Sequence, residues 1–138
     1  MRIMAIDYGD AHTGIAISDP TGFLAGYTTV INAYRPEAVA DQICSLITEY
    51  GVEELVLGHP INMDGTRGPR SEKAQAMKAL LEQRTSLPVV LWDERRTTID
   101  AHQILFNSGK NAKQRKKVVD AVAASLILEG YLTFKKSH

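Results

Sequence analysis

Acidic side chains stand in three places where this 138-residue chain is otherwise apolar. Asp7 ends a short apolar run, Asp93 and Glu94 end another, and Asp120 lies at the start of a long apolar segment. An ionised carboxylate that is buried without a partner is so costly that each of these acids needs a cation or must stay protonated. Acids that converge on one site would also repel one another. Divalent metal ions resolve that repulsion, because Mg²⁺ prefers carboxylate oxygens.

A carboxylate site of this kind predicts hydrolysis of phosphodiester bonds. Two ions, Mg²⁺ or Mn²⁺, would activate a water molecule and stabilise the leaving oxygen of an in-line displacement. Basic side chains that could hold the phosphate backbone lie next in sequence to two of the three acidic positions. They are Arg95, Arg96, Lys113, Arg115, Lys116 and Lys117.

Each acid also has a purely structural interpretation. Asp7 could cap the turn at Gly9, Asp93 and Glu94 could pair with the arginines that follow them, and Asp120 could be an acid near a helix N-terminus. Successive residues of a strand point to opposite faces, so only one of Asp93 and Glu94 should face the metal ions. The convergence of all these acids, and no single one of them, carries the argument for a metal site.

The elements that must position these acids follow from hydrophobic periodicity and turn residues. A turn at 8–10 joins the first two strands into a hairpin, and a third strand follows before any helix. The segment 59–70 is rich in Pro and Gly and is predicted to be a loop. Strands are predicted at 2–7, 14–18, 27–31, 54–58 and 87–92. Helices are predicted from Pro36 to the residue before Gly51, from Ser71 to Leu81, from Thr97 or Thr98 to the break at Ser108, and at 118–132.

The order βββαβαβαα predicts an α/β fold in one domain over residues 1–138. Crossovers through helices imply parallel strands, which gives a mixed five-stranded sheet with helices on both faces. Ligands of such folds gather at the carboxyl ends of the parallel strands. Asp7 and the pair Asp93-Glu94 would stand at that edge, and Asp120 can join them if its helix crosses it.

Charge and composition narrow the function classes. Lys plus Arg and Asp plus Glu number 16 each, which argues against a uniformly basic surface. The charge is uneven, because residues 1–92 hold 7 basic and 11 acidic side chains while residues 93–138 hold 9 and 5. One basic edge is therefore expected. The single cysteine, Cys44, excludes an internal disulfide, and no zinc pattern, signal peptide or membrane span is apparent. We expect a cytoplasmic protein.

Two other conspicuous residues are expected to be structural. His59 follows the fourth predicted strand and could touch a phosphate or assist a proton transfer, but a lone histidine beside a proline is more often packed or solvent-facing. Trp92 could stack on a base. Its place directly before Asp93 favours a role in sealing the sheet.

Five sequence blocks, taken together, resemble the YqgF family. They run through the whole chain in the family's order, which makes the match specific. The blocks are AIDYG at 5–9, TGIA at 13–16, LGHPINMDG at 57–65, DERRTT at 93–98 and DAVAA at 120–124. Two positions depart from the family pattern, His59 and Arg96, where that family usually has apolar residues. Neither departure removes a proposed metal ligand.

The resemblance implies an RNase H-like, resolvase-type fold and a metal-dependent nuclease that uses Mg²⁺ or Mn²⁺. By resemblance the catalytic acids are Asp7, Asp120 and one of the pair, with Glu94 favoured for its longer side chain and Asp93 as the second choice. The expected substrate is the 5′ end of pre-16S ribosomal RNA, on its own or within precursor particles, with a Holliday junction in branched DNA as the alternative. The substrate-binding residues that the resemblance and the basic clusters suggest are Gly9, Gly58, Asn62, Arg95, Arg96, Thr98, Lys113, Arg115 and Lys116.

Two other functions compete with the nuclease. Asp7, Gly9 and Gly14 also resemble the phosphate loop of sugar kinases and actin-like ATPases, but those proteins enclose ATP between two domains and this chain has the length of one. A nucleic-acid binder without catalysis is the third hypothesis, and the presence of all three acids argues against it. Both a monomer and a homodimer remain open.

Overall fold

The computed structural model describes residues 1–20, 25–59, 68–93 and 112–137. Its order of elements confirms the predicted α/β fold, and the helix expected after Thr97 or Thr98 lies outside the described residues. The strands are β1 Ile3–Asp7, β2 His12–Ser18, β3 Ala25–Asn32, β4 Glu54–His59 and β5 Val89–Asp93. The helices are α1 Pro36–Tyr50, α2 Pro69–Arg84 and α4 Ala112–Ser137.

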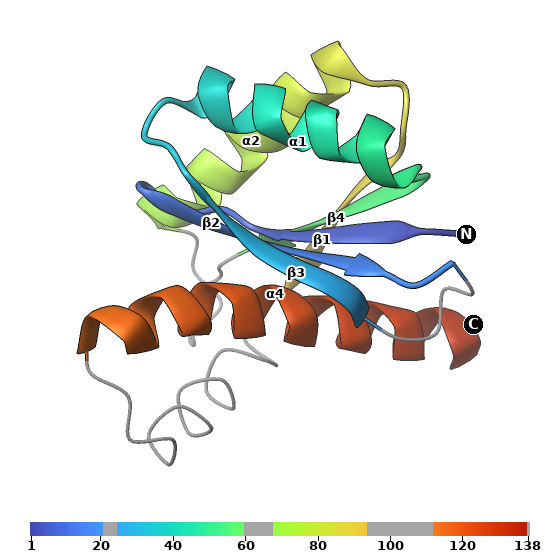
Figure 1. Ribbon diagram of the computed structural model, residues 1–138. Coiled ribbons are helices and arrows are strands. Elements are labelled where there is room, and N and C mark those ends of the chain that lie inside the picture. Colours follow the sequence, from blue (N-terminus) through green and yellow to red (C-terminus); the bar gives the residue numbers. More distant parts are fainter. Residues whose placement is uncertain (21–24, 60–67, 94–111, 138) are drawn as a thin grey trace.

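The strands form one mixed sheet in the order β3-β2-β1-β4-β5. β1 pairs antiparallel with β2, and β2 pairs antiparallel with β3. β1 pairs in parallel with β4, and β4 in parallel with β5. Helices α1 and α2 cover one face of the sheet and α4 covers the other (Figure 1). This confirms the prediction of helices on both faces.

Alternation along the strands divides the buried residues into two cores. On the α1/α2 face the core contains Met4 and Ile6 from β1, together with Leu55 and Leu57 from β4. On the α4 face it contains Ile3, Ala5 and Val56 from the same two strands, packed against five α4 residues: Ala124, Ile127, Leu128, Tyr131 and Leu132. Because both faces of β1 and β4 are buried, these strands are almost continuously apolar, as in the sequence.

Glycine and proline set the limits of α1 as predicted. Pro36 occupies the first turn of the helix, where its missing N–H costs nothing. Gly51 ends the helix in the left-handed conformation, with φ at 67°, and its N–H donates to the carbonyl of Ile47. This conformation is strained for residues with a side chain, so glycine is required here.

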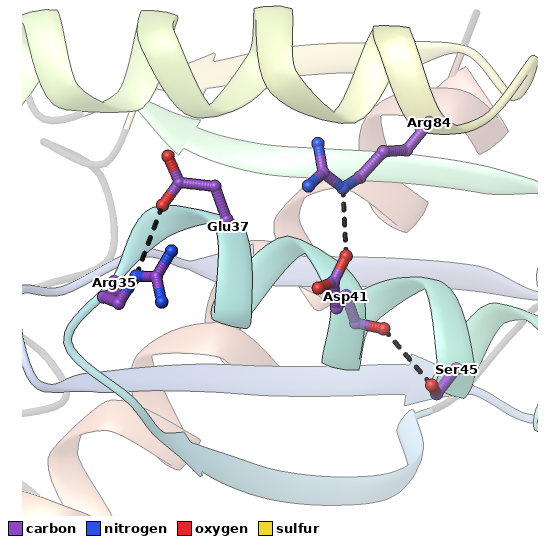
Figure 2. A network of polar contacts seen from close by, with 5 residues as sticks. All are labelled: Arg35, Glu37, Asp41, Ser45 and Arg84. Atoms are coloured by element: carbon purple, nitrogen blue, oxygen red, sulfur yellow. Dashed lines mark hydrogen bonds and ion pairs between the residues drawn. The ribbon is translucent and has the colours of Figure 1, made fainter.

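Polar contacts on the outer surface join α1 to α2 (Figure 2). Arg84 of α2 pairs with Asp41 of α1 at 3.1 Å, and the hydroxyl of Ser45 donates to the Asp41 carbonyl. Within the first turn of α1, Arg35 and Glu37 approach to 4.0 Å. Exposed pairs of this kind contribute little to stability. The two helices are therefore held mainly by the core beneath them.

Contacts at the amino end of β4 fix the position of the C-terminal part of α4. The Tyr131 hydroxyl donates to Glu54 Oε1 at 3.1 Å, and Lys135 Nζ pairs with Glu54 Oε2 at 2.9 Å. Glu54 begins β4 and is the register partner of Ile3, which begins β1. The C-terminal half of α4 therefore lies beneath the amino ends of the parallel strands. Its N-terminal half extends towards their carboxyl ends (Figure 1).

The last helix begins earlier than the sequence pattern indicated. It starts at Ala112 and not at 118, so the basic residues 113–117 form its first turns. Lys, Arg and Gln are good helix formers, so these polar positions extend the helix without an apolar face. Asp120 consequently lies in the third turn. Its interpretation as an acid near a helix N-terminus is wrong, because the effect of the helix dipole is confined to the first turn.

Other boundaries differ by one to three residues. β2 begins at His12, β3 spans Ala25–Asn32, and β5 begins at Val89 because Pro88 has no N–H and contributes only its carbonyl, to Leu55 N. The predicted loop 59–70 is shorter, since His59 belongs to β4 and Pro69 opens α2.

The hydrogen bond from the Tyr131 hydroxyl to Glu54 should make the stability of the folded protein depend on pH. Burial, and then the charge and hydrogen bond of Glu54, raise the pKa of Tyr131 from 10.0 to about 12. The folded state holds this proton more tightly than the unfolded state, so the stabilisation is complete below about pH 10 and is lost as the pH rises towards 12. We expect wild type to exceed Tyr131→Phe in Tm at neutral pH and this advantage to shrink between pH 10 and 12. Tyr34→Phe, at an 81 % exposed position, serves as the control and should show no such change.

Candidate active site

Asp7 stands at the carboxyl end of β1 and is partly buried. Ile3 and Ala5 of the same strand pack into the core on the α4 face. Because side chains alternate along a strand, Asp7 belongs to that face as well. Its register partner across the hairpin is Gly14, which leaves the space beside it without a side chain.

The turn after Asp7 is held tightly by backbone geometry. A Cβ at Gly9 would lie 2.3 Å from the carbonyl oxygen of His12, a distance that real side chains do not adopt. The Gly9 N–H contacts the hydroxyl of Thr13, a fully buried residue, at 3.5 Å. Gly9 was predicted as a substrate contact, and the structure gives it a steric role as well. The close approach of the two backbones fixes where β1 ends and so where Asp7 stands.

Asp93 stands at the carboxyl end of β5, paired in register with His59. Val89 and Leu91 of β5 pack on the α1/α2 face, while Val90 and Trp92 pack on the α4 face. Alternation therefore assigns Asp93 to the α1/α2 face, opposite to Asp7.

The third turn of α4 reaches the level of Asp7. From Tyr131, anchored at Glu54, back to position 120 the helix spans eleven residues, or about 16 Å at roughly 1.5 Å per residue. From Ile3, the register partner of Glu54, to Asp7 the strand spans about 13 Å at roughly 3.3 Å per residue. The backbone at Asp120 thus lies near the carboxyl edge, on the same face of the sheet as Asp7.

The remaining predicted site residues divide into two groups. Gly58 lies in β4, two residues after Val56, and so faces the same side of the sheet as Val56, the α4 side. Lys113, Arg115 and Lys116 lie in the first turns of α4. Five others fall outside the described residues: Asn62, Glu94, Arg95, Arg96 and Thr98. Within the described part of the chain, no group of three or more His, Cys, Asp or Glu side chains could hold a metal ion. Asp7 and Asp93 belong to that part of the chain, whereas the side chains of Glu94 and Asp120 do not.

Trp92 seals the sheet on the α4 face, as predicted. Its ring packs edge-on against Tyr131 and Phe134, each with centroids 5.7 Å away. Gly130 of α4 also lies beside the indole, and a Cβ there would meet it at 3.4 Å, an ordinary contact distance. The indole Nε1 is buried and makes no hydrogen bond with the residues that the structure describes.

Charged and apolar groups that sequence reasoning missed line the same edge on the α1/α2 face. Lys73 Nζ pairs with Asp10 Oδ1 at 2.6 Å, and this ammonium lowers the pKa of Asp10. Burial, and then the Asp10 carboxylate, raise the pKa of Tyr8. A pocket of about 400 Å³ lies beside these residues, lined by Tyr8, Lys73 and apolar residues of α2. Lys73 is one turn before the buried Met77, but no sequence pattern linked it to Asp10.

Comparison with known proteins identifies the family. The family described as "RuvX: Holliday junction resolvase" matches residues 1–134. The chain belongs to the RuvX (YqgF) family. The resemblance seen in the sequence blocks is thereby confirmed.

Curated relatives of this RuvX chain match it over nearly its whole length. A protein of Halothermothrix orenii, named "Putative pre-16S rRNA nuclease", is 45% identical over 135 residues, which cover 98% of this chain and 96% of the relative. A protein of Listeria monocytogenes with the same name is 46% identical over 134 residues, covering 96% and 97%.

Solved structures with the same fold include resolvases. RuvC of T. thermophilus, in complex with a Holliday junction substrate, matches with a TM-score of 0.64 at 13% identity, covering 99% of this chain and 96% of that one. The fowlpox virus resolvase with junction DNA matches with a TM-score of 0.52 at 13% identity, covering 99% and 98%. These likenesses confirm the RNase H-like, resolvase-type fold. A ROK hexokinase of Thermus thermophilus matches with a TM-score of 0.50 at 21% identity, but this chain covers only 38% of it.

Among the helices that the structure describes, none combines the length and hydropathy needed to cross a membrane.

The close approach at Gly9 yields a stability prediction. In Gly9→Ala the new methyl group must displace the His12 carbonyl, so we expect the free energy of unfolding to fall by about 1–3 kcal/mol, the usual cost of overpacking. Gly130→Ala is the matched control, because its Cβ has ordinary contact distances and alanine favours a helix. It should be neutral or stabilising. Urea denaturation of both variants measures the difference, and equal stability of the two would contradict the steric role of Gly9.

Proposed function

We propose that this RuvX protein is a metal-dependent nuclease that hydrolyses phosphodiester bonds of structured nucleic acid. The proposal is supported by the place of Asp7 at the end of β1 on the α4 face, and by the length of α4, whose rise per residue brings the turn with Asp120 to about the same level. The carboxyl edge of the sheet is where ligands bind in folds with parallel strands. Carboxylate donors at such a place fit a hard divalent cation.

The proposed ligands are Asp7, Glu94 and Asp120, and the proposed ions are Mg²⁺ or Mn²⁺, two per site. When bound, such ions would activate water and stabilise the leaving oxygen. Asp120 precedes Ala123 and Ala124 by three and four residues, the spacing that shares one helix face, and both alanines are buried against the sheet. This spacing supports Asp120 as a partner of Asp7.

Glu94 is preferred over Asp93 on the evidence of alternation. The alternation of side chains along β5 assigns Asp93 to the α1/α2 face, whereas Asp7 belongs to the α4 face. Because Asp93, the last residue of β5, is assigned to the other face, we choose Glu94 as the proposed ligand.

Substrate is proposed to be held by the groups around that edge. Arg95, Arg96, Lys113, Arg115 and Lys116 neutralise the phosphate backbone. Asn62 and Thr98 supply uncharged hydrogen-bonding groups. Gly9 and Gly58 are kept as proposed contacts at the carboxyl ends of β1 and β4, although the His12 carbonyl fills the space beside Gly9 and Gly58 is buried. Phosphate contacts of this kind fix register and do not select sequence.

The proposed substrate is the 5′ end of pre-16S rRNA, because relatives with 45% and 46% identity carry that name over almost the whole chain. Precursor ribosomal particles would then be partners, and the protein would act in the cytoplasm. A Holliday junction is the alternative, favoured by the family description and by the likeness to RuvC with junction DNA.

Asp7→Asn should abolish most cleavage while preserving the fold. The amide removes the charge that binds the metal ions but keeps the shape of the side chain. We expect kcat to fall at least about a hundredfold. Asp10→Asn is the matched control, because Asp10 is exposed, lies in the same turn and pairs with Lys73. It should cleave like wild type. Cleavage is measured with and without Mn²⁺, and undiminished cutting by Asp7→Asn contradicts the proposal.

One preparation tested on two substrates decides between RNA and DNA. A precursor 16S rRNA 5′ end and a four-way DNA junction are each incubated with the protein and Mn²⁺, with Asp7→Asn as the blank. We expect cutting at a defined position in the RNA. Defined cutting of the junction alone would establish the resolvase alternative, and cutting of neither would contradict the nuclease.

A further inference from the structure

One edge of the sheet is formed by β3, which pairs with β2 alone among the described strands (Figure 1). A strand at an edge presents a row of unpaired N–H and C=O groups, and proteins commonly protect such edges with charged residues or proline. β3 has the sequence AGYTTVIN and contains neither. Its Val, Ile, Tyr and Thr residues favour an extended backbone. The open side of β3 is therefore suited to pairing with another strand.

The register between β2 and β3 decides which backbone groups of β3 face outwards. The N–H of Ala33 donates to the carbonyl of Ala11, and this pair continues the ladder in which His12 lies opposite Asn32. In an antiparallel ladder, hydrogen-bonded pairs alternate with pairs that are not hydrogen-bonded. Counting back from Ala33, residues 31, 29 and 27 are thus bonded to β2. The N–H and C=O groups of the residues between them are directed to the open edge: Thr28, Val30 and Asn32.

The side chains of these three outward-bonding residues lie on the α4 face. Ala16, the register partner of Thr28, belongs to the core on that face, whereas Ile31 belongs to the core on the other face. Thr28 and Asn32 are exposed, and Val30 is half-buried. All three side chains are uncharged and none is bulky. A second copy of the same strand would therefore meet neither like charge nor a large side chain at this edge.

We propose that β3 pairs antiparallel with β3 of a second copy of this chain, around a two-fold axis at Val30. In this register Val30 lies opposite Val30 of the partner subunit, and Thr28 lies opposite Asn32 of the partner subunit. Every outward N–H and C=O group of the three residues then has a partner, and two valines form a cross-strand contact. A second copy is the occupant because the pattern is self-complementary under two-fold symmetry. This pairing does not depend on the proposed nuclease activity.

The helices leave room for this pairing. Helix α4 lies mainly beneath β2 and β1. In the joined sheet, β2 and its symmetry mate would be three strand spacings apart, or about 14 Å at roughly 4.8 Å each. Packed helices need only about 8–10 Å between their axes. The irregularity in β3 falls at Gly26, because Tyr27 pairs with Ile17 and Ala25 with Ser18, and it lies outside the paired residues 28–32.

The first test uses the wild-type chain and needs no substrate. Sedimentation equilibrium between about 1 µM and about 1 mM should show the mass rising from one chain to two, as mass action requires. In hydrogen exchange followed by NMR, the amides of Thr28, Val30 and Asn32 should gain protection over this range. The amide of Thr29, bonded to β2, should be protected at every concentration. A mass of one chain throughout, or outward amides that exchange freely in the dimer, overturns the proposal.

The second test depends on the register. In Thr28→Lys/Asn32→Lys the lysines of the two copies lie opposite each other, so we expect the dissociation constant to rise about tenfold or more. Thr28→Glu/Asn32→Glu should fail in the same way. An equal mixture of the two variants should dimerise again, because each lysine then lies opposite a glutamate. Gln42→Lys/Thr48→Lys is the matched control, since it adds the same charge at exposed positions of α1 and should dimerise like wild type.

Each other outcome contradicts the proposal in a different way. If the lysine variant dimerises as well as wild type, the interface lies elsewhere. If both charged variants and their mixture stay monomeric, the antiparallel register at Val30 is wrong. If the α1 control also loses the dimer, net charge and not β3 controls association. Thermal unfolding checks that each variant is folded. Should the lysine variant fail to fold, Val30→Pro replaces it and should be monomeric, because the lost N–H faces the open edge and not β2.

Discussion

The placement of α4 on the sheet depends on its core packing together with the contacts that Glu54 makes with its last turns. Tyr131 and Lys135 bind the two oxygens of that carboxylate, so the C-terminal end of the helix is fixed at the amino ends of the parallel strands. Ala124, Ile127 and Leu128 are buried in one core with residues of β1 and β4, and this packing lays the helix along the sheet. At about 1.5 Å of rise per residue, its other end extends towards the carboxyl ends of the strands. The backbone at Asp120 is thereby brought to the face of the sheet that holds Asp7.

Alternation along the strands imposes the second constraint. The sheet separates the residues at the carboxyl ends of its parallel strands into two groups, one on each face, and the two groups differ in chemistry. The α4 side holds the position of Asp7 and the basic first turns of α4, and suits metal ions and phosphate. The α1/α2 side holds His59, Ser71 and Gln75 in a buried hydrogen-bonded cluster, beside the pair of Lys73 and Asp10. Rigid support on one side of a sheet is well suited to hold reactive groups on the other.

Much of this arrangement could be predicted from the sequence because the signals are local. The apolar runs of β1 and β4, and Pro36 and Gly51 at the ends of α1, determine element type by themselves. The predicted start of α4 was wrong because the prediction relied on apolar residues at helical spacing. Residues 113–117 belong to the helix but are polar, so they give no such pattern. The contacts of His59 with Ser71 and Gln75 could not be predicted from the sequence either. These residues lie twelve and sixteen positions after His59 and meet it only through tertiary packing. His59 itself was expected to be packed or solvent-facing, and it is packed.

Trp92 has a consequence for how the protein can be studied. It is the single tryptophan of the chain and directly precedes Asp93 at the end of β5. Its indole is packed against Tyr131 and Phe134 of α4, with Nε1 shielded from solvent and without a hydrogen bond to the described part of the chain. Its fluorescence therefore comes from one known location, where β5 meets the helix that carries Asp120. The molecule contains its own optical probe for any event that loosens or tightens that junction, with no label to attach.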